Sequence, residues 1–596
     1  MTSKFPYSAL DIDTLRAAHA DGERTWLRDL RPDLPHALVQ SIERAIDPDP
    51  ARRFATAGAM ERALHPDVAP IADVRSRETT VGKLTPSTGW QRSMFAALAI
   101  TLIAAVTGLI IWSRMTSSRG TDVSKIRTIA VLPMVDTTGS GVSGEFAAGF
   151  TEELISALGQ VHVLTVKTGS SLATIWGKSD KEIAEQLDVD ALLKTSVSTS
   201  AASSGDQPRL KVRARILAAG TQGIVWFQDF DRHRGDSNAL ANAIAVAVTS
   251  AVKADLTPEE SGRLAVVRQT DPAAEDEFLA GRGYIEGYGG KSANAALDAF
   301  QRALQIDARH AGAHAGAARA YVNLGANGLI SHMEARAAAL AEARQSLDLD
   351  PNLPDGHAVM AYILFAYDWD LPRSEREFTR ALELNPNSSY ALTYYAQLLS
   401  AQARFGESLS LEEKAKRLDP RSGSAARNYA LLLYYKGDLA AAERALQESA
   451  DLETNQPGLP LLRGRFAEAR GDFNGALADT RQALQLTSGA VPLRVQEIRL
   501  QALAGLKSDA MANLATLQRE AADRKIRVTT RDLAYIALAL GERTKATALF
   551  EEAMIEHDPS LVWLGVDPRV DTLRGTPRFR QMLKTIGLPA ELGEVR

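Results

Sequence analysis

The most apolar stretch of the chain begins at Met94 and ends at Trp112, nineteen residues without a charge or a proline. As a helix it would span about 28 Å, close to the roughly 30 Å hydrocarbon core of a bilayer. Trp90 lies just before it, and Arg92 and Arg114 bracket it, which is typical of residues at a membrane interface. The pattern therefore predicts one transmembrane helix over residues 94–112.

Downstream of this run, short apolar stretches alternate with amphipathic ones. Along residues 126–258 the order is strand, helix, strand, helix, three strands and a helix, which predicts a mixed sheet covered by helices. We therefore expect a small α/β domain there, after a linker over residues 113–125. The expected strands are residues 126–135, 161–166, 191–198, 210–217 and 224–230, and the expected helices are residues 145–158, 180–187 and 238–254.

From residue 271 onwards the sequence repeats itself with a period of 34 residues. The string that begins at Ala381 recurs at Ala415, and Gly437-Asp438 recurs as Gly471-Asp472. Such a period is the sequence signature of stacked helical hairpins. We expect seven or eight hairpins over residues 271–556, with small residues at 361, 396, 430 and 464 where two helices approach closely, and a C-terminal cap over residues 557–596.

The residues before the apolar run contain two or three short amphipathic helices, in residues 1–65, and a linker rich in Ser, Thr, Gly and Pro, in residues 66–93. The string LRDLRPDLPHALVQSIERAIDPDPARRFATAGAMERAL resembles the last helices of the C-lobe of bacterial serine/threonine protein kinases. The resemblance implies that Arg53 matches an arginine that is buried against a glutamate of the A-P-E motif. That motif, with H-R-D and D-F-G, would lie upstream of Met1. Residues 1–65 are therefore expected to be a kinase tail without its catalytic part, from a truncated reading frame or a gene remnant.

Two further resemblances cover the rest of the chain. The string IAVLPMVDTTGSGVSGEFAAGFTEELISALGQVHVLTVKTGSS, with residues 183–197 and 214–232, resembles the TolB-N-terminal-like domain of bacterial signalling proteins. This resemblance implies sensing or docking over residues 126–258. The 34-residue hairpins resemble tetratricopeptide repeats, whose superhelix has a concave groove for an extended peptide or a helix of a partner.

Composition and charge exclude several classes of function. The net charge is −5, which argues against nucleic acid as a partner, and the absence of cysteine excludes disulfides and thiolate chemistry. His310 and His314 have the spacing of metal ligands but lack the carboxylate of an H-E-x-x-H motif. We expect no catalytic, cofactor-binding or metal-binding residues in the chain and no cofactor. Whether the chain is an enzyme stays uncertain; a full-length version would be a serine/threonine protein kinase.

The candidate partner-binding residues are those expected to point into the groove from the first helix of a hairpin. An arginine and an asparagine on adjacent first helices would hold a carboxylate of a peptide. The alternative, a solvated helix face without a partner, stays open. The candidates are Thr393, Gln397, Arg427, Asn428, Tyr434 and Arg465.

Together these features predict a multidomain, mostly α chain, with a tetratricopeptide-type α-solenoid, a small α/β domain and one transmembrane helix. We expect a sensor at the bacterial inner membrane that crosses it once, binds protein partners and works as a homodimer. The kinase resemblance places its N-terminus in the cytoplasm and its C-terminal domains in the periplasm, because four basic residues on each side of the run give no orientation. Two alternatives stay open: the C-terminal part of a functional receptor-type kinase, and a transmembrane regulator of transcription or cyclase signalling.

Overall fold

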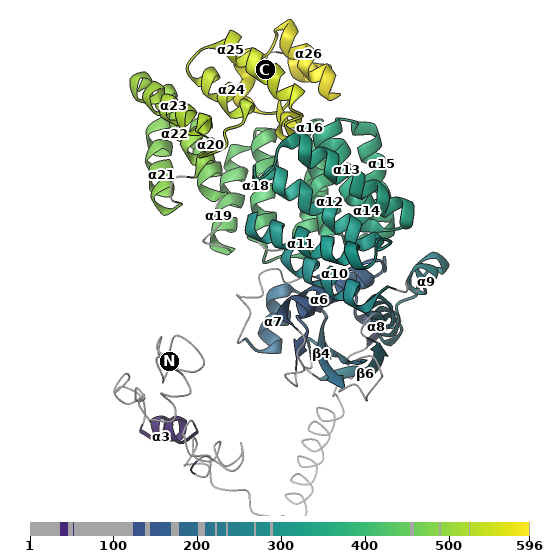
Figure 1. Ribbon diagram of the computed structural model, residues 1–596. Coiled ribbons are helices and arrows are strands. Elements are labelled where there is room, and N and C mark those ends of the chain that lie inside the picture. Colours follow the sequence, from purple (N-terminus) through teal and green to yellow (C-terminus); the bar gives the residue numbers. More distant parts are fainter. Residues whose placement is uncertain are drawn as a thin grey trace, which may run out of the picture. The chain divides into compact units, whose positions relative to one another are not determined.

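The computed structural model describes residues 36–45, residue 52 and residues 123–594, the last with gaps at 137–142, 168–177, 201–208, 221–222, 234–235, 267–269, 286–289, 453–457, 488–489 and 524. The chain divides into two units, Met1–Ile111 and Trp112–Arg596. In the first unit the structure describes one amphipathic helix, α3 (His36–Ala45), at the place where the sequence predicts one. The second unit holds a sheet domain and a helical array (Figure 1).

Within the described residues no helix is both long and apolar enough to cross a bilayer. The longest of them, α13 (His332–Leu349), has 18 residues and carries charged side chains from Glu334 to Asp348. The expected single-pass localisation at the inner membrane is contradicted by this finding, and we correct it. The predicted helix over residues 94–112 lies outside the described residues.

The sheet domain begins with a short 3-10 turn, η2 (Val123–Lys125), and has helices on both faces of one sheet. Its strands are β1 (Thr128–Val131), β2 (Val135–Asp136), β3 (Thr165–Lys167), β4 (Ala191–Ser200), β5 (Arg209–Ala218) and β6 (Ile224–His233), and its helices are α6 (Gly144–Gly159), α7 (Asp180–Leu187), α8 (Ser237–Ala251) and α9 (Pro258–Leu264). The strand order is β3-β1-β4-β5-β6, with β2 beside β4. Parallel pairing joins β1 to β3 and β4, and antiparallel pairing joins β4, β5 and β6. The mixed sheet predicted from the sequence is therefore present.

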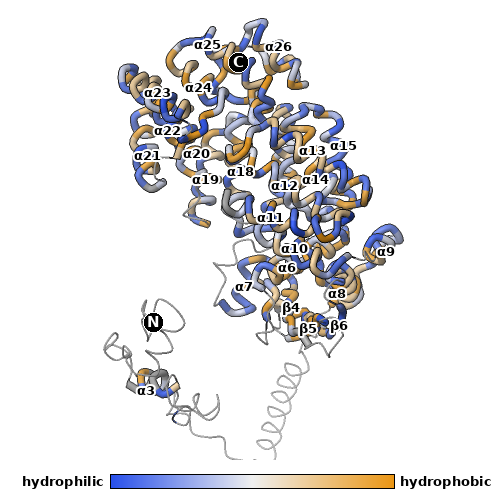
Figure 2. Tube along the Cα trace, viewed as in Figure 1, coloured by the Kyte–Doolittle hydropathy of each residue, from blue (hydrophilic) through white to orange (hydrophobic). Residues whose placement is uncertain are grey.

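Alternation of apolar and polar residues decides which face each strand buries. In β5 every second residue from Leu210 to Ala218 is buried, and the residues between them are more exposed. The buried side packs on α6 and α8, while the opposite side of β1 and β4 packs on α7 through Leu187 and Leu192. Figure 2 shows hydrophobic and hydrophilic positions alternating along the elements of this unit.

After the sheet domain, sixteen described helices form eight consecutive hairpins. Each hairpin has a first and a second helix, and the first helix of the third hairpin continues into a π-helical turn, η5 (Leu364–Asp368). The pairs are α10 (Pro272–Ile285) and α11 (Gly290–Ile306); α12 (Ala311–Ala326) and α13; α14 (Pro354–Ile363) and α15 (Leu371–Leu384); α16 (Ser389–Ala401) and α17 (Phe405–Leu418); α18 (Gly423–Lys436) and α19 (Leu439–Leu452); α20 (Leu459–Ala469) and α21 (Phe473–Leu486); α22 (Val491–Leu503) and α23 (Lys507–Ala522); α24 (Thr530–Ala539) and α25 (Arg543–Ile555).

Small residues at intervals of 34 let the two helices of a hairpin approach closely. The Ser374 hydroxyl donates a hydrogen bond of 2.7 Å to the Ala361 carbonyl oxygen, and Ser408 donates one of the same length to Ala396. The equivalent positions of the next three hairpins are fully buried alanines, namely Ala442, Ala476 and Ala510. Ala361 and Ala396 are themselves fully buried, as the repeat pattern predicts.

The turn between the two helices of a hairpin needs a residue with a left-handed backbone. Glycine supplies it at Gly437 and Gly471, with φ of 90° and 76°, but the equivalent residue in the fourth hairpin is Ala403, with φ of 61°. A Cβ makes this conformation costly by about 1–2 kcal/mol, whereas glycine adopts it freely.

We expect Ala403→Gly to raise the free energy of unfolding by about 1 kcal/mol, since it relieves this strain at a partly exposed turn. Urea unfolding followed by circular dichroism would measure the change. In the control, Ala515→Gly at an exposed position in the middle of helix α23, the sign should reverse, because glycine destabilises a helix interior by about 1 kcal/mol. Destabilisation by both substitutions would contradict the expectation.

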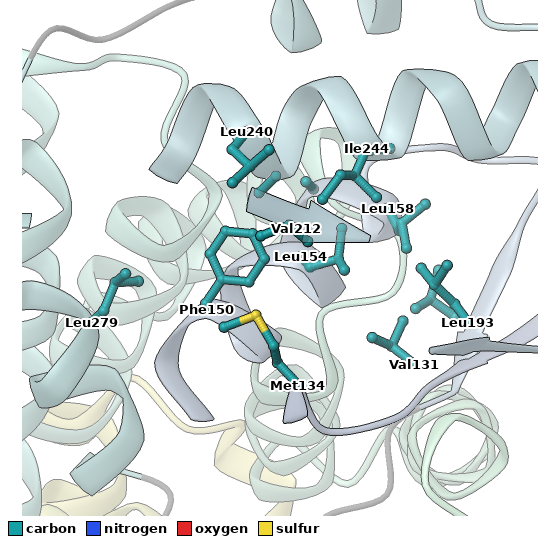
Figure 3. Close-up of a cluster of buried hydrophobic side chains, with 14 of the residues drawn as sticks. Val131, Met134, Phe150, Leu154, Leu158, Leu193, Val212, Leu240, Ile244 and Leu279 are labelled. Atoms are coloured by element: carbon teal, nitrogen blue, oxygen red, sulfur yellow. The ribbon is translucent and has the colours of Figure 1, made fainter. Parts of the chain in front are cut away.

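The sheet domain and the first hairpin share one hydrophobic core. Leu279 of α10 is fully buried in the same cluster as Phe150 of α6, and Figure 3 shows the two side chains in this core. Gly149 allows the close crossing of α6 and α10, because a Cβ there would lie within 2.6 Å of the Leu279 carbonyl carbon. At the edge of the contact, Arg282 Nη1 lies 2.8 Å from Glu153 Oε2.

The C-terminal residues form short helices: η6 (Pro559–Trp563), η7 (Pro568–Leu573), α26 (Pro577–Ile586) and η8 (Ala590–Gly593). The sequence predicts a cap over these residues. Helix α26 does contact α25 of the last hairpin. However, Leu561, Val562 and Phe579 belong to a core cluster with residues of α14 and α15, five hairpins earlier. These residues therefore pack against a large part of the array.

Candidate functional site

The segment from His557 to Leu573, which we call the C-terminal segment, lies against the first helices of several hairpins. His557 Nδ1 is 2.7 Å from the Tyr367 carbonyl oxygen, and the Trp563 ring stacks on that of Tyr435 with centroids 4.7 Å apart. Further along, the Tyr535 hydroxyl lies 2.7 Å from Asp567 Oδ2. Because the third, fifth and eighth hairpins meet one short segment, the array must curve around it. The groove expected from the sequence therefore holds part of the chain itself.

A buried ion pair anchors the middle of the C-terminal segment. Asp567 is fully buried, and its carboxylate receives Arg569 Nη2 at 2.6 Å. The Arg569 guanidinium lies 4.1 Å from the centre of the Tyr535 ring. Burial alone would raise the pKa of Asp567, but the charges of Arg569 and Arg465 and the hydrogen bonds from Arg569 hold it well below its usual range. Asp567 is therefore a carboxylate at neutral pH.

Between the C-terminal segment and the array there is a cavity of about 170 Å³, which we call the inner cavity. Its walls come from α12, the start of α13, α14, η5, α16, α24 and η6. Its lining combines aromatic residues with hydrogen-bonding groups. The aromatic residues are Tyr362, Phe365 and Trp563, and the polar ones include His332, Gln397 and Ser560.

His332 is the unusual member of this wall. Its side chain is 10% exposed, and neither ring nitrogen has a hydrogen-bond partner among the described residues. Its nearest charged group is Asp558, whose Oδ2 lies 3.6 Å from His332 Nε2. Arg531 Nη1 lies 3.1 Å from Asp558 Oδ1, whereas the Oδ2 beside His332 has no hydrogen-bond partner among the described residues. Burial lowers the pKa of His332 and outweighs the opposing effect of Asp558, so its imidazole is neutral at pH 7.

The structure places the six residues that the sequence analysis proposed for partner binding in different surroundings. Gln397 lines the inner cavity. The positive charge of Arg465 is one of those that lower the pKa of Asp567. Thr393 is half-buried and donates a hydrogen bond of 3.4 Å to Glu412 Oε1. Arg427 and Asn428 are half-buried on α18.

Tyr434 differs from the others, because only 4% of it is exposed. Its ring stacks on that of Phe466, with centroids 5.2 Å apart, and it belongs to a core cluster. Burial and the charge of Asp567 raise the pKa of Tyr434, and Val566 belongs to the same core cluster, so the C-terminal segment also lies close to this tyrosine. We therefore leave Tyr434 out of the candidate surface.

Several residues of this site were missed by the sequence analysis. They are His332, Arg531, Tyr535, Asp558, Trp563 and Asp567. A signal for two of them is present in the sequence: Asp558-Pro559 and Asp567-Pro568 are paired Asp-Pro steps, and each aspartate caps the short helix that follows it. His332 carries no such signal, because it is only the first residue of a helix.

Clustered metal ligands are absent from the part of the chain that the structure describes. No group of three or more His, Asp or Glu residues there could hold a metal ion. The two histidines with metal-ligand spacing have separate partners: His310 Nε2 lies 3.1 Å from Glu275 Oε2, and His314 Nδ1 lies 2.5 Å from Glu342 Oε2. Their contacts hold helices together.

Comparison with known proteins finds one curated relative and several solved structures that are similar to parts of the chain. No family model matches the chain. A protein of Rhizobium meliloti (strain 1021) named "Putative adenylate cyclase 3" is 30% identical over 243 residues, which are 40% of this chain and 40% of that protein. Similar solved structures include PilF of Pseudomonas aeruginosa, with 21% identity, a TM-score of 0.28 and coverage of 37% of this chain and 95% of that chain. A tetratricopeptide repeat protein from Parabacteroides merdae has 15% identity, a TM-score of 0.31 and coverage of 45% and 96%.

The TM-scores are below 0.5, so the eight hairpins and the 34-residue spacing of this chain carry the assignment of a repeat array. None of these comparisons supports the kinase-tail or the TolB-like resemblance. The expected homodimer stays a prediction, because the structure contains one chain.

Proposed function

We propose that this protein binds protein partners through its helical repeats and that it recognises acidic peptide segments along the first helices of the fourth to sixth hairpins. The observation that carries the proposal is the way in which the array holds its own C-terminal segment. That segment is rich in proline and short turns, and it is held by an aromatic contact at Trp563 and a carboxylate at Asp567. A partner segment of similar chemistry would use the part of the same helices that the C-terminal segment leaves exposed.

The charge of this surface supports an acidic partner. Arg427 and Asn428 lie side by side in sequence on α18, and Arg465 follows on α20, all of them half-buried. Arginine can bind a carboxylate with two parallel hydrogen bonds, and an asparagine amide adds a donor. Half-buried side chains lose less conformational entropy on binding than fully exposed ones.

The experiment is a selection of peptides from a random library on the full-length protein, followed by fluorescence anisotropy with the selected peptides. We expect acidic peptides, and we expect Arg427→Ala to weaken their binding about tenfold, as removal of one charged hydrogen bond does. Arg444→Ala, on the exposed side of the second helix α19, is the matched control and should bind normally. Selected peptides that bind Arg427→Ala as tightly as the wild type would contradict the proposal.

A second candidate function is the regulation of cyclase signalling. It is favoured by the 30% identity over 243 residues with the cyclase-named protein of Rhizobium meliloti. It predicts that expression of this chain changes cyclic AMP levels in a bacterial host that has an adenylate cyclase. Cyclic AMP levels would be measured by mass spectrometry at matched expression. Unchanged levels would contradict this second function and favour peptide binding.

A further inference from the structure

The sheet domain contacts the array at two places that are far apart along it. One is the core shared with the first hairpin. The other is Asn387, in the turn between α15 and α16, whose Nδ2 donates hydrogen bonds of 3.0 Å to the carbonyl oxygens of Gly159 and Leu164. Its Oδ1 accepts a third hydrogen bond, of 3.3 Å, from the N–H of Val166 in β3. Both polar atoms of one side chain therefore bind the backbone of the sheet domain, and we call this contact the latch.

The two contacts differ in chemistry. The core cluster of the sheet domain contains Phe278 and Phe300 of the first hairpin but, among the described residues, none of the third or fourth hairpin. On the side of the latch, α17 lies against β3, and Arg282 Nη1 is 3.4 Å from Asp355 Oδ2, in a side chain that is 46% exposed. Polar groups that separate regain hydrogen bonds to water, whereas an apolar core that opens does not. The latch can therefore open while the shared core stays closed.

Helix α12 lies between two separate packing clusters. Ala313 and Ala317 pack into the core of the sheet domain and the first hairpin. Ala318 and Val322, on another side of the same helix, pack with the third and fourth hairpins and the C-terminal segment. A cleft of about 50 Å³ lies between the two clusters, and its walls include Phe278 of α10 and Tyr390 of α16. The array therefore consists of two packed bodies that are joined along α12 and held together by the latch.

We propose that the sheet domain and the first hairpin form a hinged unit, in which α12 is the hinge and Asn387 keeps the unit closed against the rest of the array. When the latch opens, the unit rotates away from the fourth hairpin and the cleft beside Tyr390 widens. A molecule that binds the sheet domain could in this way change the shape of the array. The motion does not depend on the peptide binding proposed above.

The test measures the distance between two spin labels in the full-length chain by double electron–electron resonance. The chain has no cysteine, so Lys211→Cys in β5 and Gly406→Cys in α17 place one label on each side of the hinge, at exposed positions. Asn387→Asp keeps the size of the side chain but turns two hydrogen bonds into repulsive contacts with carbonyl oxygens. We expect the ratio of closed to open chains to fall about 100-fold, so that a second, longer distance appears. A distance distribution identical to that of the unsubstituted chain would overturn the proposal.

Two controls separate opening of the latch from general loosening. Asn352→Asp makes the same change at the equivalent position of the preceding turn, where the side chain is exposed and accepts a hydrogen bond from Arg380 that a carboxylate also accepts. Its distances should equal those of the unsubstituted chain. Labels at Gly406→Cys and Lys584→Cys both lie beyond the hinge, so this pair should keep one distance in Asn387→Asp. A second distance for this pair would mean that the array itself loosens, and it would overturn the proposal.

A measurement on the wild-type chain needs no variant. The N–H of Val166 is bound by the latch, whereas the N–H of Phe150 lies inside α6, in the shared core. Hydrogen exchange, read by mass spectrometry with fragmentation to single residues, compares the two amides. We expect Val166 to exchange at least tenfold faster than Phe150, because the latch opens without unfolding of the core. Equal protection of both amides would contradict a hinge.

Discussion

Gly149→Ala is expected to lower the free energy of unfolding by about 3 kcal/mol, because the new methyl group would overlap the backbone of Leu279. A flexible side chain could move aside, but a helix backbone can move only if α6 and α10 separate along their whole contact. That separation would expose Phe150 and Leu279, which are fully buried in the shared core. The change is measured as a shift of the urea midpoint, followed by circular dichroism.

Gly144→Ala is the control for this prediction. It makes the same substitution at the start of the same helix, where nothing lies within 4 Å of the new Cβ. We expect its free energy of unfolding to stay within about 0.5 kcal/mol of the wild type, as for most surface substitutions. If the two variants unfolded at the same urea concentration, the close crossing of α6 and α10 would be wrong.

Asp567→Asn should destabilise the protein by about 3–5 kcal/mol, since it leaves the charge of Arg569 buried without its partner. The amide has nearly the same shape as the carboxylate. The loss in free energy of unfolding therefore comes from the missing charge and not from a change in packing. Glu551→Gln is the matched control, because it removes the same kind of partner from Arg578 in a pair that is 51% and 41% exposed. Exposed pairs of this kind contribute about 0–1 kcal/mol.

A double substitution tests whether the loss of stability comes from breaking the ion pair or from removing the aspartate itself. Asp567→Leu combined with Arg569→Met replaces both charges by apolar side chains and should recover most of the stability lost in Asp567→Asn. Thermal unfolding of the three variants at one pH makes the comparison. A double variant as unstable as Asp567→Asn would show that the ion pair is not the reason for the loss.

The repeat array could be predicted from the sequence because its interactions are local. A hairpin needs small residues where its helices cross and a left-handed residue at its turn, and these recur after 34 residues, as at Ala396 and Ala430 and at Gly437 and Gly471. The long strands β4 to β6 were predictable for the same reason, since alternation in β5 depends only on neighbouring residues, whereas the expected strand 126–135 is divided into β1 and β2 and the expected strand 161–166 begins only at Thr165. Patterns with a short period therefore identified most of the elements.

The candidate site could not be predicted in this way, because it depends on the curvature of the whole array. Asp567 contacts Tyr535, which lies 32 residues earlier in the chain, and His557 contacts Tyr367, which lies 190 residues earlier. No period in the sequence connects these pairs. Tyr434 shows the same limit, since a helical pattern can place it on a side of α18 but cannot show which neighbour covers that side.

The shared core of the sheet domain and the first hairpin has a consequence for how the protein is built. A solenoid has two open ends, and each end exposes apolar surface unless a terminal unit covers it. Here α6 covers the first end and the residues after α25 cover the last, so both ends are closed by parts that are not repeats. A hairpin gained or lost between the third and the eighth would also move Tyr367 and Tyr535 apart or together, and the contacts of both with the C-terminal segment would be lost.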